Sequence, residues 1–136
     1  MANESKAFLL TWKTWEHENI LRLLGEYKQN GFALHKWQIN AHTQADIGMP
    51  VAIYSQHDEG RGIFGIGFIY GKLAQESSPY FNIAFTRFRD PLAKTYINDR
   101  LSQALLGDLV HSQSSGNTIA AEQYAAIASQ VLLAGD

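Results

Sequence analysis

Two tryptophans carry the clearest chemical signal in this sequence. Trp12 and Trp37 each stand near the end of an apolar stretch, beside polar neighbours. Stacking a nucleobase on an aromatic ring contributes about 1–3 kcal/mol per base, so tryptophans at strand ends can line a pocket for a flat base. Large aromatic residues also cap hydrophobic cores. Composition alone favours the core role, and both interpretations stay open at this point.

Four cations give a weaker signal for phosphate binding. Arg87 and Arg89 are two residues apart in an alternating stretch, so they share one face of a strand, and Arg61 and Lys36 add to them. Together they can grip phosphates locally, although exposed arginines at strand ends are also ordinary solubilising groups. The formal net charge is −2, from 11 basic and 13 acidic residues. A protein that coats nucleic acid would be basic, so any such role needs a local site.

Catalysis and metal binding have little support in the sequence. The chain has no cysteine, which excludes disulfides, iron–sulfur clusters, cysteine-ligated zinc and a cysteine nucleophile. Its five histidines show neither the i,i+4 spacing of a helical zinc site nor an H-E-x-x-H motif. No G-x-S-x-G nucleophile elbow is present. We therefore expect a binding protein without enzymatic activity, metal or cofactor.

A glycine-rich stretch resembles a dinucleotide motif but stands in the wrong context. Residues 60–65 match G-x-G-x-x-G letter for letter, yet they lead straight into an apolar strand and not into a helix. Gly65 and Gly67 leave one face of that strand bare. A bare face admits a second backbone or a flat ligand, and a β-bulge is the other interpretation.

The elements that must position these residues follow from hydrophobic patterning. The chain has 136 residues, of which 46% are hydrophobic, and we expect one domain over residues 1–136. The patterning predicts strands over residues 7–12, 32–39, 50–56, 62–70 and 80–89, helices over residues 15–30 and from a cap at Asn117 or Thr118 onward, and short helical turns within 92–107. Consecutive strands favour an α+β fold with an antiparallel, curled sheet that forms a small barrel.

The sequence also bears on location. Its longest apolar stretches, such as Ile63–Gly71, are too short to span a bilayer. The first six residues show no basic segment followed by an apolar one, so we expect no signal peptide. These patterns indicate a cytoplasmic protein with no membrane partner.

At this point the order of features resembles that of EVE domains, of the type found beside nuclease domains in bacterial restriction systems. The shared features are an opening strand, a tryptophan, a glycine before a strand, a glycine-rich strand and a Q-S-S-G segment before the last helix. In this sequence they are, in order, Phe8–Trp12, Trp37, Gly48, Val51–Ser55, Gly62–Gly67 and Gln113–Gly116. The resemblance covers about residues 7–133 and implies a PUA-like fold, a small curled β-barrel of about five to six strands with flanking helices.

The resemblance also implies a function and a site. Restriction-linked members are implied to bind 5-methylcytosine or 5-hydroxymethylcytosine in DNA, turned out of the duplex into an aromatic pocket. Carried over by position, the pocket residues are Trp12, Trp37, Tyr54, Ser55, Gln56, His111 and Gln113, with Lys36, Arg61, Arg87, Arg89, Ser114 and Ser115 contacting the backbone phosphates. His111 stands near a position where such members often carry tryptophan, and Asn117 and Thr118 separate Gly116 from the isoleucine that follows it in the family.

The sequence also bears on DNA cleavage and leaves two alternative functions open. No nuclease motif is present, so cleavage would belong to another domain or subunit. The alternative is a PUA-like module that binds RNA or a small flat ligand in the same cavity. An enzyme with a site of a new kind is a third hypothesis, and no nucleophile–base pair supports it.

Overall fold

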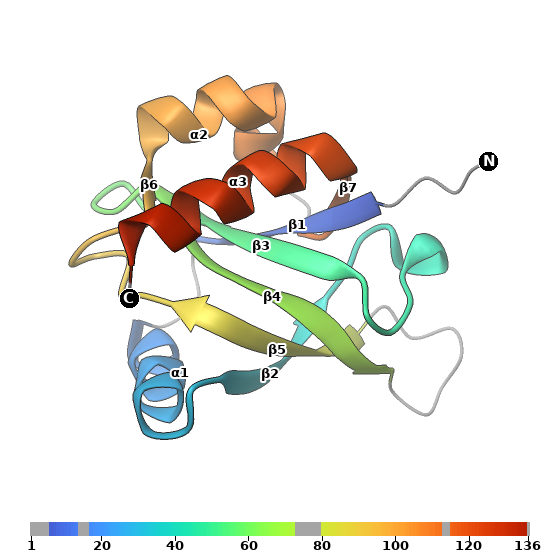
Figure 1. Cartoon of the computed structure of the whole chain (residues 1–136), viewed down its shortest axis with the longest axis horizontal. Helices are drawn as coiled ribbons and strands as arrows, with labels where there is room; N and C mark the ends of the chain where they lie inside the picture. Colours follow the sequence, from blue (N-terminus) through green and yellow to red (C-terminus); the bar gives the residue numbers. More distant parts are fainter. Residues whose placement is uncertain (1–5, 14–16, 73–79, 113–114, 136) are drawn as a thin grey trace.

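A curled sheet of seven strands organises the molecule (Figure 1). The computed structural model describes residues 6–13, 17–72, 80–112 and 115–135. The strands are β1 (Lys6–Trp12), β2 (Ala33–Gln38), β3 (Pro50–Ser55), β4 (Gly62–Lys72), β5 (Tyr80–Phe88), β6 (Ile97–Asn98) and β7 (Asn117–Ala120). They lie in the order β2-β5-β4-β3-β1-β7, with β6 paired to β4. The predicted α+β fold with a curled sheet is confirmed.

One strand pair departs from the predicted antiparallel arrangement. β1 and β3 run parallel, with Phe8 opposite Val51 and Trp12 opposite Ser55. Two parallel neighbours need a crossover of a dozen or more residues. The chain between them supplies it with α1 (His17–Asn30), β2 and the short 3₁₀ helix η1 (His42–Gln44). The remaining strand pairs are antiparallel, and the predicted β3–β4 hairpin is confirmed.

Both faces of the central strands are buried, which explains their nearly continuous apolar sequence. Along β1, Phe8, Leu10 and Trp12 face a core that is covered by α1. Leu9 and the other inward residues of the opposite face pack under α2 (Asp99–Leu106) and α3 (Ala121–Ala134). Figure 1 shows α2 and α3 together over one side of the sheet and α1 at the other end.

The helix ends follow standard capping chemistry. α1 ends before Gly31, which has a φ of 85° and so adopts the left-handed conformation that glycine tolerates best. The Leu101 backbone N–H donates to the Asn98 side chain at 2.9 Å and caps α2. A second 3₁₀ helix, η2 (Gly107–His111), continues from α2. Over the described ranges, none of the helices combines the length and the apolar character needed to cross a membrane.

The last helix begins at a later residue than the sequence predicts. Asn117 and Thr118 do not cap α3, because residues 117–120 form β7 and pair with β1, with Ile119 opposite Ala7. The helix begins at Ala121 instead, and the Gln123 side chain accepts the Ala120 backbone N–H at 2.8 Å. Pairing with β1 satisfies backbone groups along one side of this edge strand and overrides the local capping preference of Asn117 and Thr118.

The surroundings of the glycine-rich strand β4 decide between the two interpretations of its bare face, a ligand-binding surface and a β-bulge. The pairing of β4 with β5 shifts register between Ile66 and Gly67. A Cβ atom built on Gly67 would lie 1.9 Å from the Ala84 carbonyl oxygen. The bare face is therefore occupied by the backbone of β5 at a β-bulge, where a side chain has no room.

Candidate functional site

A short segment connects β1 to the chain that follows β2. Among the described strands, β1 and β2 are not paired with each other. This bridging segment, residues 115–117, leads into β7. The Gly116 N–H donates to the Leu9 carbonyl of β1 at 2.8 Å, and the Asn40 N–H donates to the Ser115 carbonyl at 2.7 Å. Ala41 adds a bond to the Gly116 carbonyl at 3.1 Å. The bridging segment therefore holds β1 and the chain after β2 at a fixed separation.

Gly116 can only be glycine at this place. Its φ is 87°, and an added Cβ would lie 2.4 Å from the Ile39 Cα and 2.7 Å from the Asn40 nitrogen. Both contacts are with backbone atoms, which cannot rotate away as a side chain can. Close backbone approach and a left-handed φ are the two conditions that glycine alone meets.

The hydroxyl group of Ser115 fixes one of the two tryptophans. Its Oγ accepts the Trp37 indole N–H at 3.1 Å and the Thr11 backbone N–H at 3.1 Å. A serine hydroxyl has two acceptor positions, and these bonds occupy both. Ser115 therefore ties β1 to β2 through the orientation of the Trp37 ring.

A cleft opens beside the bridging segment and consists of two adjoining lobes. The polar lobe has a volume of about 580 Å³ and is lined by Thr11, Lys13, Gln38, Asn40, Gln56, Arg61, Val110, His111, Ser112 and Ser115. The aromatic lobe has a volume of about 300 Å³ and is lined by Thr11, Trp12, Lys13, His35, Lys36, Trp37, Gln38, Tyr80 and Ser115. Thr11, Lys13, Gln38 and Ser115 line both. Small-molecule sites in proteins have volumes of this order.

The aromatic lobe contains both predicted tryptophans, at different depths. Trp37 is 9% exposed and meets the Phe85 ring edge-on. Trp12 is 2% exposed, and its ring stacks on His57 with a centroid separation of 5.4 Å. Tyr80 is 42% exposed at the rim, where the Lys36 ammonium lies 5.8 Å from its ring centroid. The lobe therefore has an aromatic floor and a cationic, aromatic rim.

A histidine beside Trp37 has surroundings that lower its pKa and so favour its neutral form. The His35 ring meets the Trp37 ring edge-on, with centroids 5.7 Å apart. Burial lowers the pKa of His35, and the nearby Arg22 charge lowers it further, although Glu26 opposes them. A neutral imidazole adds aromatic surface to the lobe without a charge.

The polar lobe is lined by cations and amides. Lys13, Arg61 and His111 are its ionisable residues, and among the described residues that line it none carries a carboxylate. The Arg61 guanidinium bonds the exposed Asp58 carboxylate at 3.1 Å, outside the lining. Across the described part of the chain, no group of three or more histidine, cysteine or acidic residues is arranged to hold a metal ion.

Several predicted site residues lie away from the cleft. Tyr54 and Ser55 are fully buried and line neither lobe. The Tyr54 hydroxyl donates to Asp99 on the α2 side of the sheet, and the Ser55 hydroxyl oxygen accepts the His57 N–H at 3.3 Å. The predictions for Gln113 and Ser114 fall outside the described residues.

The environment of Tyr54 predicts how stability depends on pH. Burial, assisted by the Asp99 carboxylate, raises its pKa from 10.0 to about 12. The unfolded chain then releases this proton near pH 10 while the folded chain still holds it, so the free energy of unfolding falls as pH rises from 10 toward 12. We expect Tyr54→Phe to make this fall shallower in urea titrations across that range. An equally steep fall in the variant would assign the effect to other tyrosines, such as Tyr96, whose pKa is also raised by burial.

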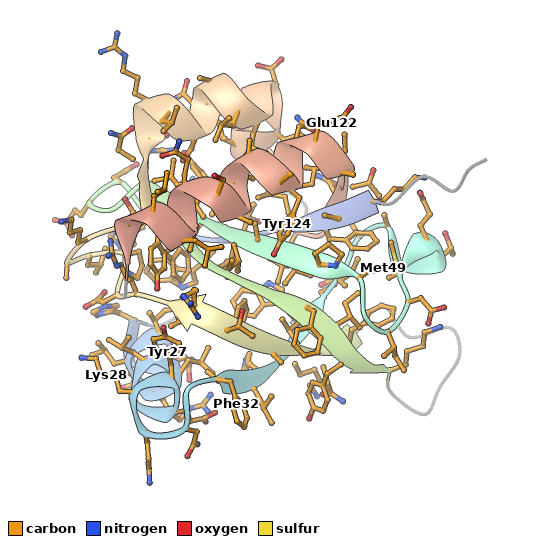
Figure 2. All side chains as sticks on the ribbon, in the orientation of Figure 1. Tyr27, Lys28, Phe32, Met49, Glu122 and Tyr124 are labelled. Carbon is orange, nitrogen blue, oxygen red and sulfur yellow. The ribbon has the colours of Figure 1, made fainter. Side chains whose placement is uncertain are left out.

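Two predicted phosphate contacts belong to a different surface. Arg87 and Arg89 line a separate cavity next to α1, near Tyr27 and Lys28, which Figure 2 labels. The Arg89 guanidinium donates to the carbonyls of Thr95 and Ala134, at 3.1 Å each. Arg89 therefore fastens the end of α3 to the chain that precedes α2.

Some lining residues were missed as functional candidates. Thr11, Lys13 and Gln38 flank the two tryptophans in the sequence, and this proximity was the available signal. No sequence signal indicated Asn40 and Ser112, because these residues are far apart in the chain and the bridging segment brings them together. The Asn117 amide links them, accepting from Asn40 at 2.9 Å and donating to the Ser112 hydroxyl at 2.6 Å.

Comparison with known proteins shows a similarity of the fold. No protein-family model and no curated protein sequence matches the chain. The solved YTH domain of Pho92, in complex with m6A, is similar with a TM-score of 0.51 and 15% identity over 95% of this chain and 84% of that one. The chain shares its fold. Protein PSPTO5229 from Pseudomonas syringae is similar with a TM-score of 0.50 and 18% identity over 92% of this chain and 99% of that one.

Proposed function

We propose that this chain is a nucleic-acid-binding module that holds one modified base in the aromatic lobe. The observation that carries the proposal is the placement of Trp37, whose indole is fixed by Ser115 at the wall of a cleft. The fold supports it, because a domain of the same fold was solved in complex with m6A. We assign no catalytic step to the chain.

The energetics of base recognition suit this cleft. Turning a base out of a duplex costs a few kcal/mol, and a pocket recovers that cost by stacking and by hydrogen bonds to the base edge. Stacking on one aromatic ring contributes about 1–3 kcal/mol. The aromatic lobe offers Trp37 and Tyr80 for stacking, and the cations Lys13 and Lys36, which also line it, are the groups we propose for the phosphates that flank the base.

For the ligand we propose 5-methylcytosine or 5-hydroxymethylcytosine in DNA, as the resemblance to EVE domains implies. The chain would then be the reader of a modification-dependent restriction system, in the cytoplasm, with cleavage carried out by a nuclease domain or subunit elsewhere. The alternative is a PUA-like module that binds RNA or a small flat ligand, and the similar YTH domain, solved in complex with m6A, is the observation that supports a ligand other than modified cytosine.

A titration against matched nucleic acids tests both. The protein is titrated at ~0.1 M salt, where distant surface charges are largely screened, against duplexes with cytosine, 5-methylcytosine, 5-hydroxymethylcytosine or N6-methyladenine and against RNA with N6-methyladenine. We expect about fourfold tighter binding to the 5-methylcytosine duplex than to the cytosine duplex, because burying one added methyl group contributes about 0.8 kcal/mol. A preference for methylated adenine in RNA would support the alternative. Equal, weak binding to every probe would overturn both.

A further inference from the structure

The proposed function places one base in the aromatic lobe and leaves the larger polar lobe without an assigned ligand. Its volume is about 580 Å³, against about 300 Å³ for the aromatic lobe. The two lobes share Thr11, Lys13, Gln38 and Ser115 as a common wall. A nucleic-acid strand with one base in the aromatic lobe therefore has its adjacent nucleotide within reach of the polar lobe, with Lys13 between the two.

The charges of the polar lobe suit a nucleotide. Lys13 and Arg61 are the cations that line it, with Arg61 paired to Asp58 outside the lining, and the described lining residues include no carboxylate, although the whole chain has a formal net charge of −2. Cationic side chains position the phosphates of a strand but carry no sequence information. Selection among bases has to come from groups with a fixed donor or acceptor character.

Gln56 is such a group. Its Nε2 donates to the Val110 carbonyl at 3.0 Å and to the Ser112 carbonyl at 2.6 Å. A carbonyl oxygen only accepts hydrogen bonds, so the nitrogen and not the oxygen of the amide must face these two groups. Both N–H donors are thereby used. The polar atom that Gln56 retains for a ligand in the lobe is Oε1, which is an acceptor.

Resting on the proposed function, we propose that the polar lobe holds the nucleotide next to the modified base and that Gln56 Oε1 accepts a hydrogen bond from its exocyclic amino group. Adenine and cytosine present such an amino group. Hypoxanthine and uracil present a carbonyl at the same place, and two facing acceptors repel each other. The module is therefore selective for an amino-bearing base on one side of the modified base.

The test compares single-stranded oligonucleotides that differ in one neighbouring base. Single strands are used because the stability of a neighbouring base pair then does not enter the affinity. Each strand has 5-methylcytosine at its centre. The base on one side of it is varied, first between adenine and hypoxanthine and then between cytosine and uracil, and the same is done on the other side. On one side of the modified base we expect about three- to tenfold tighter binding to the amino-bearing base, the size of one net hydrogen bond. Equal affinities on both sides would overturn the inference.

A second series separates this inference from the proposed function. The same oligonucleotides are prepared with unmodified cytosine at the centre. A preference for 5-methylcytosine without neighbour selection overturns the role of Gln56 and supports the base reader. Neighbour selection without a preference for 5-methylcytosine overturns the base reader and supports the role of Gln56. The absence of binding to every strand overturns both.

A pair of variants tests whether the Gln56 side chain causes the preference for an amino-bearing neighbouring base. Gln56→Met keeps the length of the side chain and removes the acceptor, together with the two hydrogen bonds that Nε2 donates to Val110 and Ser112, so we expect equal binding to adenine and hypoxanthine neighbours. Gln130→Met on the exposed face of α3 is the matched control and should keep the selection. Selection that persists in Gln56→Met overturns the assignment. If that variant does not fold, the comparison of neighbouring bases with the unaltered protein decides.

Discussion

Gly116→Ala is expected to cost about 2–5 kcal/mol of unfolding free energy, the sum of a left-handed backbone penalty and an overpacking penalty. The new Cβ would lie 2.4 Å from the Ile39 Cα, in a segment that bonds to Leu9 on one side and to Asn40 on the other. Relief of the clash would have to separate these two sides. Urea unfolding followed by circular dichroism measures the loss.

Gly31→Ala is the matched control for this substitution. Gly31 has a φ of 85°, close to the 87° of Gly116, but an added Cβ there meets no atom within 4 Å. We expect it to cost only the conformational penalty, about 1–2 kcal/mol. The difference between the two variants then measures the clash at the bridging segment. Equal losses would show that Gly116 is needed for its backbone conformation alone.

Trp37→Ala is expected to weaken binding of the modified base by about tenfold to a hundredfold, because stacking contributes about 1–3 kcal/mol per base. The indole is nearly buried at the aromatic lobe and donates to Ser115. The same change also leaves a cavity in the core, at about 3–5 kcal/mol of stability. Binding is therefore measured by fluorescence anisotropy at a temperature at which circular dichroism shows the variant folded.

Ile127→Ala separates the two effects of the tryptophan substitution. Ile127 is a fully buried residue of α3 and packs in the core on the other side of the sheet. Its truncation is expected to cost about 2–5 kcal/mol of stability and to leave the affinity for the modified base unchanged. Similar losses of affinity in Trp37→Ala and Ile127→Ala would indicate that stability limits binding and would contradict a stacking role for Trp37.

The strands β1 to β5 could be predicted because each alternates or is buried as a run, as in β5 and in the β3–β4 hairpin. The parallel pairing of β1 with β3 could not, because the pattern within a strand does not name its neighbour. Asn117 and Thr118 have the chemistry of a helix cap, and their pairing with β1 depends on residues more than 100 positions earlier in the chain. Long-range backbone pairing overrode a local preference there.

The candidate site was predictable in part for similar reasons. Trp37 could be found because a large aromatic residue at a strand end has few roles. Tyr54 was placed with Gln56 as a pocket residue, because side-chain alternation puts residues two apart on one face of a strand. In the structure Gln56 lines the polar lobe, whereas Tyr54 is fully buried and its hydroxyl donates to Asp99 on the α2 side. The role of Ser115 could not be predicted from the sequence. Its Oγ joins groups 78 and 104 positions away, and such separations leave no local pattern.

The distance in sequence that Ser115 spans also affects when the cleft forms. Thr11 and Trp37 leave the ribosome early, whereas Ser115 is made 104 residues after Thr11. At a synthesis rate of about 5–20 residues per second, the first strands wait several seconds for the segment that completes the cleft. A growing chain therefore has its tryptophans long before it has a place to bind a ligand, and recognition begins only once nearly all of these residues have been synthesised.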